Sequence, residues 1–267
     1  MRQTRFTAAF GSTTDDRGVT EVLSFVLVFS IVLTSVILVG LVGFQAIEDY
    51  QENEKLGNAE RAMDAFADNA NDVVRNDGVT HRSGTLTLRE GTVSPGEAGT
   101  TLDATVYDEH GSPTWNWSDE YAGEDLGAFV YETDSMTVAY EGGGVFRGSG
   151  DGSSAVISDP MVTCRERTDT ALVSLVKISH GDRSIQSTEG MEFRLSKVDG
   201  ETVRKFETGT ENVTVEVEDG PHRGGWETYF ENAEGWEWDE TENAAVCDAD
   251  SVSIDVVEVQ IDYPELG

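Results

Sequence analysis

The chain has 267 residues and a formal net charge of −33, from 51 acidic and 18 basic side chains. Because 48 of the acidic residues follow Ile47, the first 47 residues are neutral and the remainder carries the whole excess. A surface this acidic repels polyanions, which excludes nucleic acid as an expected partner. Aromatic and β-branched residues recur throughout the acidic part, so it is predicted to fold rather than form a disordered tail.

The acidic excess and the scarcity of lysine together predict adaptation to high salt. Lysine occurs only four times, as Lys55, Lys177, Lys197 and Lys205. At about 1 M salt the Debye length falls to about 3 Å, which screens the self-repulsion of so acidic a domain. This halophilic character describes a habitat and leaves the function open.

An uncharged apolar run begins close to the N-terminus and predicts a membrane-spanning helix. Val22 to Ile47 contains no charged residue, and about 20 helical residues suffice to cross a bilayer core. Because Arg2, Arg5 and Arg17 precede the run, positive-inside logic places the N-terminus in the cytoplasm and the rest outside. A cleaved secretory signal is disfavoured, because its apolar core is only about 7–15 residues long. A buried core helix is disfavoured too, because soluble helices of this length carry a polar face.

Residues 48–77 are predicted to extend the helix as an amphipathic segment. The apolar positions are spaced three and four residues apart, as in a helix that packs along one seam; they are Leu56, Ala59, Met63, Phe66, Ala70 and Val73. Asn76-Asp77-Gly78 then ends the helix. Two uses of this seam stay open, namely packing inside the chain's own domain and packing against another subunit.

The junction before the apolar run carries a resemblance to a known family. Asp15-Asp16-Arg17-Gly18-Val19-Thr20-Glu21-Val22-Leu23 resembles the N-terminus of archaeal type IV pilins and archaellins, which have class III signal peptides. The stretch from Arg17 to about Val74 is similar to haloarchaeal pilin-like surface proteins of unknown function. This resemblance implies cleavage by a prepilin-type peptidase between Gly18 and Val19. It further implies association with identical or other pilin-like subunits through the retained helix.

Glu21 departs from the pattern of that family. Type IV pilins often have a glutamate five residues into the mature chain, which pairs with the terminal amine of a neighbouring subunit. Cleavage after Gly18 places Glu21 at the third position instead. Its carboxylate then either finds such an amine or lies solvated at the start of the helix.

Residues 78–267 are predicted to form an acidic β-rich domain. Short apolar or alternating runs are separated by glycine-rich turns, which favours a sandwich-like antiparallel assembly. The expected strands are 85–89, 101–107, 128–132, 136–140, 155–158, 171–178, 191–198, 202–208, 212–218 and 251–263. Asp199-Gly200 is expected to be the turn of a hairpin that joins two of them. The expected fold class is therefore α+β, with one long N-terminal helix and an all-β domain.

The domain contains one pair of cysteines and two glycosylation sequons. Outside the cell a disulfide between Cys164 and Cys247 is expected, because nothing there keeps thiols reduced. Asn116-Trp117-Ser118 and Asn212-Val213-Thr214 are acceptor sequons, so Asn116 and Asn212 are candidate glycosylation sites.

No catalytic constellation, metal site or cofactor motif is predicted. The four histidines are His81, His110, His180 and His222, and their spacing does not favour zinc. Acidic clusters near residues 238–242 and 248–250 fit no calcium loop and are expected to be solvated. The tryptophan pairs 115/117 and 236/238 are either an exposed stacking platform or, as we favour, part of the core.

Two functions remain, and neither is enzymatic. In the first, residues 1–18 are a cytoplasmic leader, 19–47 the transmembrane helix, 48–77 its extension and 78–267 the extracellular domain of a pilin-like subunit. Such a subunit has a structural or adhesive role at the cell surface. In the second, the same single-pass protein is never cleaved and its domain binds a glycan or an envelope protein.

Overall fold

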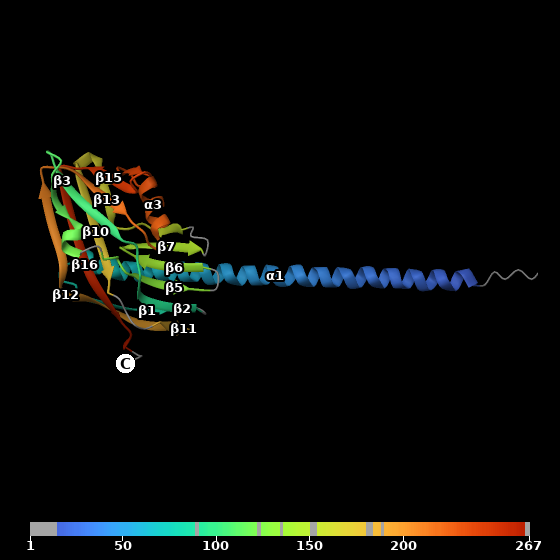
Figure 1. The fold of residues 1–267 in the computed structure, drawn as a ribbon. Helices are drawn as coiled ribbons and strands as arrows, with labels where there is room; N and C mark the ends of the chain where they lie inside the picture. The colour runs from blue at the N-terminus through green and yellow to red at the C-terminus, as the bar shows by residue number, and fades with distance from the viewer. Residues whose placement is uncertain are drawn as a thin grey trace, which may run out of the picture. The chain divides into compact units, whose positions relative to one another are not determined.

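A computed structural model describes residues 15–88, 91–121, 124–133, 136–149, 154–179, 184–187 and 190–264. Helix α1 (Asp15–Arg75) is the first element in Figure 1. The chain divides into two compact units, Met1–Glu54 and Lys55–Gly267, so the boundary falls inside this helix. We call the second unit the folded domain. It begins within the predicted extension 48–77 rather than after it.

The first unit is the N-terminal part of α1. Its apolar residues are compatible with a long helix because no proline interrupts them. The hydroxyl of Thr34 donates to the carbonyl oxygen of Ser30 at 2.7 Å, and that of Ser35 donates to Ile31 at 2.8 Å. These side chains therefore satisfy their polar groups within the helix, as an apolar environment requires.

The C-terminal part of α1 supplies one wall of the core of the folded domain. Ala59, Met63, Phe66, Ala70 and Val73 are at most 1% exposed and pack in a cluster with strand residues of the same domain. Phe66 stacks on Phe129 with ring centroids 4.3 Å apart. Of the two uses left open for the predicted seam, the structure therefore shows packing inside the domain.

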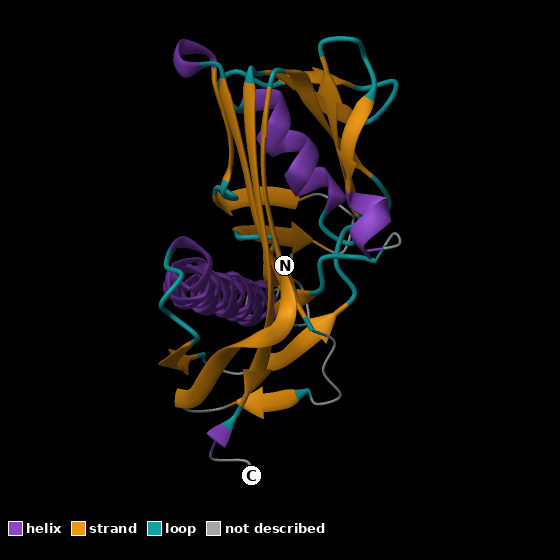
Figure 2. Cartoon of the chain, turned by 90° about the vertical axis from the view of Figure 1, so that its left-hand side faces the viewer, coloured by secondary structure: helices purple, strands orange, loops and turns teal. Residues whose placement is uncertain are grey.

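The folded domain contains three β-sheets, which dominate the view in Figure 2. The first sheet has the order β1 (His81–Thr87), β12 (Gly190–Thr208), β16 (Ser251–Asp262), β10 (Thr170–Ile178), β9 (Val162–Arg165). The second has the order β11 (Ile185–Ser187), β2 (Gly91–Glu97), β5 (Ala128–Glu132), β6 (Met136–Glu141), β7 (Gly144–Ser149), β8 (Ser154–Ser158). The third has the order β14 (Glu237–Asp239), β15 (Ala244–Asp248), β13 (Thr210–Val217), β3 (Leu102–Asp108), β4 (Pro113–Asn116).

Strand pairing confirms the predicted class and corrects one local feature. The chain is α+β, and the strand pairs among the described residues are antiparallel except for the parallel pair β10 and β16. The expected hairpin at Asp199-Gly200 is wrong. β12 continues through these residues with a register shift between Lys197 and Thr202, and both halves pair with β16. Gly200 has φ +88°, so it turns the backbone into a bulge rather than into a reversal.

Short helices complete the domain: α2 (Trp117–Tyr121), α3 (Arg223–Asn232) and the 3-10 turn Glu166–Thr168. Helix α3 was not predicted, because its first turn contains Gly224 and Gly225, which disfavour helix. Trp226, Tyr229 and Phe230 form its buried face, at the spacing of one helical stripe. A side chain at Gly225 would collide with the ring of Phe146, so the packing of α3 requires glycine at this position. The same glycine is the reason that the sequence did not predict a helix here.

Candidate functional site

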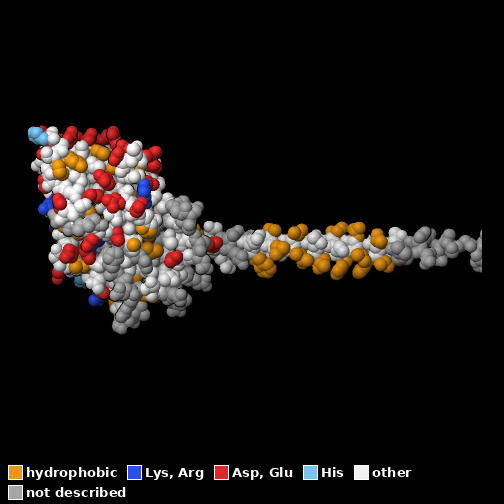
Figure 3. All heavy atoms as spheres, viewed as in Figure 1, with side chains coloured by type: hydrophobic (Ala, Val, Ile, Leu, Met, Phe, Trp, Pro, Cys, Tyr) orange, Lys and Arg blue, Asp and Glu red, His pale blue; other side chains and the backbone are white. Residues whose placement is uncertain are grey.

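The apolar part of α1 is the most distinctive surface of the first unit. Every large apolar side chain from Val22 to Ile47 is between 49% and 73% exposed. Figure 3 shows these side chains along the helix. Among the described residues, the structure has one helix that is long and apolar enough to cross a membrane.

The predicted processing site lies near the start of the same helix. Gly18 and Val19 are helical in the structure, and Glu21 is exposed. Helix α1 begins at Asp15, upstream of the expected scissile bond. Cleavage between Gly18 and Val19 and the pairing of Glu21 with an amine stay predictions.

Cys164 and Cys247 form a disulfide, the pairing expected for an external location. Cys164 lies in β9 of the first sheet and Cys247 in β15 of the third, so the bond joins two sheets. Both residues belong to the buried cluster that also contains α3. Gly235, with φ +84°, lies close enough that a side chain there would press on Cys164.

The two sequon asparagines occupy different environments, and both have partly buried side chains. Asn116 ends β4, where its amide nitrogen donates to the hydroxyl of Thr105 at 2.7 Å and its oxygen accepts from the backbone of Ser118. Asn212 lies within β13 and is paired on both sides, opposite Asp248 and Tyr107. A glycan at Asn116 would have to displace the hydrogen bond to Thr105, and glycosylation of either residue stays a prediction.

The histidines and tryptophans do not form a ligand site in the described part of the chain. His81 is exposed in β1, His110 is exposed in the turn after β3, His222 is buried, and His180 lies outside the described residues. No group of three or more metal-ligating side chains occurs among the residues that the structure describes. Trp115, Trp117 and Trp236 are at most 7% exposed, and Trp238 is partly buried against the same core. The interpretation of both pairs as core is confirmed.

The acidic residues near 238–242 include a turn stabilised within the chain. The carboxylate of Asp239 accepts from the backbone amides of Thr241 and Glu242, and these bonds lower the pKa of Asp239. This carboxylate therefore caps a turn. Figure 3 shows many further acidic side chains on the visible face of the domain.

A buried carboxylate, Glu141, is the polar feature that the sequence did not reveal. Glu141 ends β6 and is fully buried, and its Oε1 accepts from the indole nitrogen of Trp226 at 2.7 Å. Its Oε2 and the nearby hydroxyl of Thr100 lack a partner with normal hydrogen-bond geometry. Burial raises the pKa of Glu141 to about 7, although Trp226 and Thr100 oppose the rise and Asp125 adds to it. This group can hold a proton near neutral pH.

His222 is a second buried ionisable group, located just before α3. Its ring stacks on Phe146 with centroids 6.3 Å apart, and neither ring nitrogen has a hydrogen-bond partner in the described chain. Burial lowers the pKa of His222 to about 4. The imidazole is therefore neutral in the native domain at neutral pH.

Asn71 connects helix α1 to the turn that follows Glu141. Its amide nitrogen donates to the carbonyl oxygen of Gly143 at 2.8 Å, and its oxygen accepts from the hydroxyl of Tyr140 at 2.9 Å. Gly142 and Gly143 have φ of +59° and +103°, and a side chain on Gly142 would collide with Trp226. Residues of helices α1 and α3 thus contact the same glycine-rich turn.

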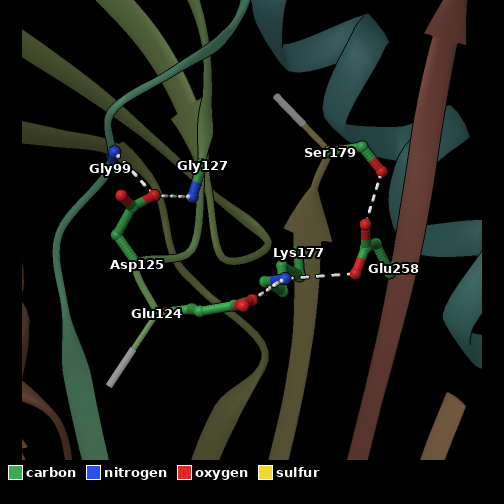
Figure 4. A network of polar contacts seen from close by, with 7 residues as sticks. All are labelled: Gly99, Glu124, Asp125, Gly127, Lys177, Ser179 and Glu258. Atoms are coloured by element: carbon green, nitrogen blue, oxygen red, sulfur yellow. Dashed lines mark hydrogen bonds and ion pairs between the residues drawn. The ribbon is translucent and has the colours of Figure 1, made fainter. Parts of the chain in front are cut away.

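A buried lysine, Lys177, is at the centre of the network in Figure 4. The ammonium of Lys177 lies 2.6 Å from a carboxylate oxygen of Glu124 and 3.1 Å from Oε2 of Glu258. The other carboxylate oxygen of Glu258 accepts from the hydroxyl of Ser179. Burial alone lowers the pKa of Lys177, but the two carboxylates outweigh it and the net shift is upward. Beside this network Asp125 accepts from the amides of Gly99 and Gly127. These contacts join loops to β10 and β16, and they have the character of structural ties.

The comparisons with known proteins assign a family but no role. A comparison with the curated proteins found no match, and neither did a comparison with the solved structures. A family model described as a family of unknown function, DUF7289, matches residues 17–262. This match covers the helix α1 from Arg17, all three sheets and the disulfide. The chain therefore belongs to the DUF7289 family.

Proposed function

We propose that the chain is a non-enzymatic protein of the cell surface, anchored by one transmembrane helix and related in role to type IV pilin subunits. Its folded domain lies outside the cell and has a structural or adhesive function. The observation that carries the proposal is the uncharged helix from Val22 to Ile47, whose large side chains are all exposed. The proposed host is a haloarchaeon, because the acidic excess suits molar salt.

Energetics favour a bilayer as the environment of this segment. Burial of apolar surface is favourable by about 25 cal/mol per Å². The exposure of this many apolar side chains to water is therefore unfavourable. At 1.5 Å per residue the segment is about 39 Å long, which spans a core of about 30 Å with some tilt. The hydroxyls of Thr34 and Ser35 are already satisfied within the helix, so they oppose insertion little.

Two features support the proposed orientation. Arg2, Arg5 and Arg17 precede the segment, and the positive-inside rule places such basic residues in the cytoplasm. The disulfide between Cys164 and Cys247 suits a compartment where thiols are not kept reduced. Both features favour a domain outside the cell.

The anchor is tested by membrane fractionation of the full chain. The double variant Leu33→Arg/Ile37→Arg places two charges near the middle of the segment, each costing about 3 kcal/mol on insertion scales. We expect most of this variant to leave the membrane fraction on alkaline carbonate extraction. Tyr50→Arg is the matched control, because Tyr50 is exposed on the same helix outside the apolar run. Equal retention of both variants would refute the anchor.

The pilin-like part of the proposal is tested at the N-terminus. The intact mass and first residue of the protein purified from native membranes distinguish the two hypotheses. A chain beginning at Val19 supports processing by a prepilin-type peptidase. A chain that still carries Met1 or Arg2 contradicts it.

The second candidate is an uncleaved, membrane-anchored binding module for a glycan or an envelope protein. One observation favours it: the seam of α1 from Ala59 to Val73 is buried inside the folded domain. That seam cannot simultaneously pack against another subunit. Assembly through the helix therefore has to use residues before Lys55.

A further inference from the structure

The second half of β12 has a free edge. β1 pairs with residues 190–196 only, whereas β16 pairs with Thr202 to Thr208 along the other side. In the described parts of the chain no strand covers the outer side of Thr202–Thr208. Half of the N–H and C=O groups in such a segment point outward without a strand partner, which makes the edge a template for another strand.

Phe206 lies in the middle of this free edge and is 67% exposed. Among the described residues after Tyr50, it is the one large hydrophobic side chain that is exposed. Side chains alternate along a strand, so Phe206 shares its face with Arg204 and Thr208, while Lys205 and Glu207 lie on the other face. The exposed aromatic ring is unfavourable in water, so a partner that covers it is favoured.

We propose that this edge pairs with the same edge of a second copy of the chain, antiparallel and with a two-fold axis at Phe206. The sequence Lys205-Phe206-Glu207 is self-complementary in this register. Phe206 lies opposite the partner's Phe206. Lys205 lies opposite the partner's Glu207, and by symmetry Glu207 lies opposite the partner's Lys205. A two-fold axis requires this kind of self-complementary surface.

The pairing extends the first sheet across both copies. Directly opposed side chains in antiparallel strands are the pairs that stabilise a sheet, and both aromatic and opposite-charge pairs do so. Arg204 is already held by Asp255 of the neighbouring strand and by Asp77 at 2.6 Å. It therefore keeps the start of the edge in place, next to the segment that pairs with the second copy. The edge lies wholly within the folded domain, so the pairing does not require membrane anchoring.

The net charge makes the pairing salt-dependent in a specific direction. Two copies of charge −33 repel each other, and this repulsion is screened as the Debye length falls from about 10 Å at 0.1 M to about 3 Å at 1 M. The two cross-strand ion pairs are weakened as well, but they involve far fewer charges. We expect association to strengthen between about 0.1 and 1 M salt.

The register is tested by disulfide cross-linking of the full chain at high salt. Opposed residues in antiparallel strands have Cα atoms about 4.5–5.5 Å apart, within reach of a disulfide. Phe206→Cys loses the aromatic pair but keeps the strand hydrogen bonds and both Lys205–Glu207 pairs, and a disulfide traps each encounter. It is therefore expected to give a covalent dimer on mild oxidation. Thr202→Cys is the matched control on the same strand and face, and its two copies are about 27 Å apart in the proposed register. The native cysteines are already paired and do not interfere.

A charge swap in the Phe206→Cys background provides the second test. Lys205→Glu places like charges opposite each other twice and is expected to lower cross-linking about tenfold. Adding Glu207→Lys restores opposite charges in exchanged positions and is expected to restore cross-linking. No dimer from Phe206→Cys, equal cross-linking from Thr202→Cys, or no rescue by the second charge change would each overturn the proposed interface.

Discussion

The ionisation of Glu141 gives a quantitative test of the folded domain. The side chain is fully buried, and the carboxylate of Asp125 raises its pKa further. The pKa of Glu141 rises from the ordinary value of 4.5 to about 7. The native domain therefore keeps a proton on Glu141 that the unfolded chain releases. Glu141→Gln is the perturbation, because the amide has the same shape but never ionises.

The sign and size of the expected change in the free energy of unfolding follow from proton linkage. A group whose native pKa is raised loses stabilisation as pH increases from its unfolded to its native pKa. For Glu141 this window runs from 4.5 to about 7, and each unit corresponds to about 1.4 kcal/mol. Wild type should therefore lose about 3 kcal/mol relative to Glu141→Gln over this range, after which the difference stays constant.

His222 makes the free energy of unfolding change with pH in the opposite direction, over almost the same pH range. Its pKa falls from 6.5 to about 4, so the unfolded chain binds a proton that the native domain does not. Its contribution is present above pH 6.5 and is lost as pH falls toward 4, again by about 3 kcal/mol. In wild type the two slopes largely cancel. We therefore expect Glu141→Gln to be acid-sensitive and His222→Gln to be base-sensitive, each exposing the slope of the remaining group.

The free energy of unfolding is measured by urea titration of the full chain at constant high salt, between pH 4.5 and 8. Tryptophan fluorescence reports on the folded domain, since all five tryptophans lie in it. Glu132→Gln is the control, because Glu132 ends the neighbouring strand β5 but is exposed. A difference between wild type and Glu141→Gln that does not change with pH would refute the reasoning.

Two further predictions concern ties between distant parts of the domain. Reduction of the Cys164–Cys247 bond, which closes a loop across 83 residues of sequence, should lower the free energy of unfolding by about 4 kcal/mol; an unchanged urea midpoint after complete reduction would contradict this. Asn71→Ala should cost about 3 kcal/mol, because it leaves the carbonyl of Gly143 and the hydroxyl of Tyr140 buried without partners; a loss under 1 kcal/mol in the same titration would show that water replaces the amide.

The features predictable from the sequence are those that depend on neighbouring residues. The run from Val22 to Ile47 identifies itself by length and lack of charge. The seam from Leu56 to Val73 has the period of one helix face, and alternating runs with glycine-rich turns indicate strands. These patterns were sufficient for the α+β class and for the longest strands. They missed β2, β7 and five shorter strands, which lie outside the expected ranges.

Partner choice between strands was not predictable in the same way. The Asp199-Gly200 pair has the composition of a hairpin turn, yet β12 passes through it as a bulge. The reason is that the parts of β12 before and after the bulge both pair with β16. The parallel pairing of β10 with β16 joins segments that are far apart in the chain. Pairing of this kind depends on which surfaces meet in three dimensions, and local composition does not encode it.

The sequence by itself determined the anchor-like helix, the acidic β-rich domain and the one possible pair of cysteines. Only the tertiary structure decided how the polar groups are used. It placed Glu141 and His222 in the core and assigned Asn71 to the turn after Glu141. It also left the edge at Phe206 without a neighbouring strand among the described residues. The physical reason is that burial and hydrogen bonding depend on groups brought together from distant positions, whereas apolar length and periodicity are local properties of the chain.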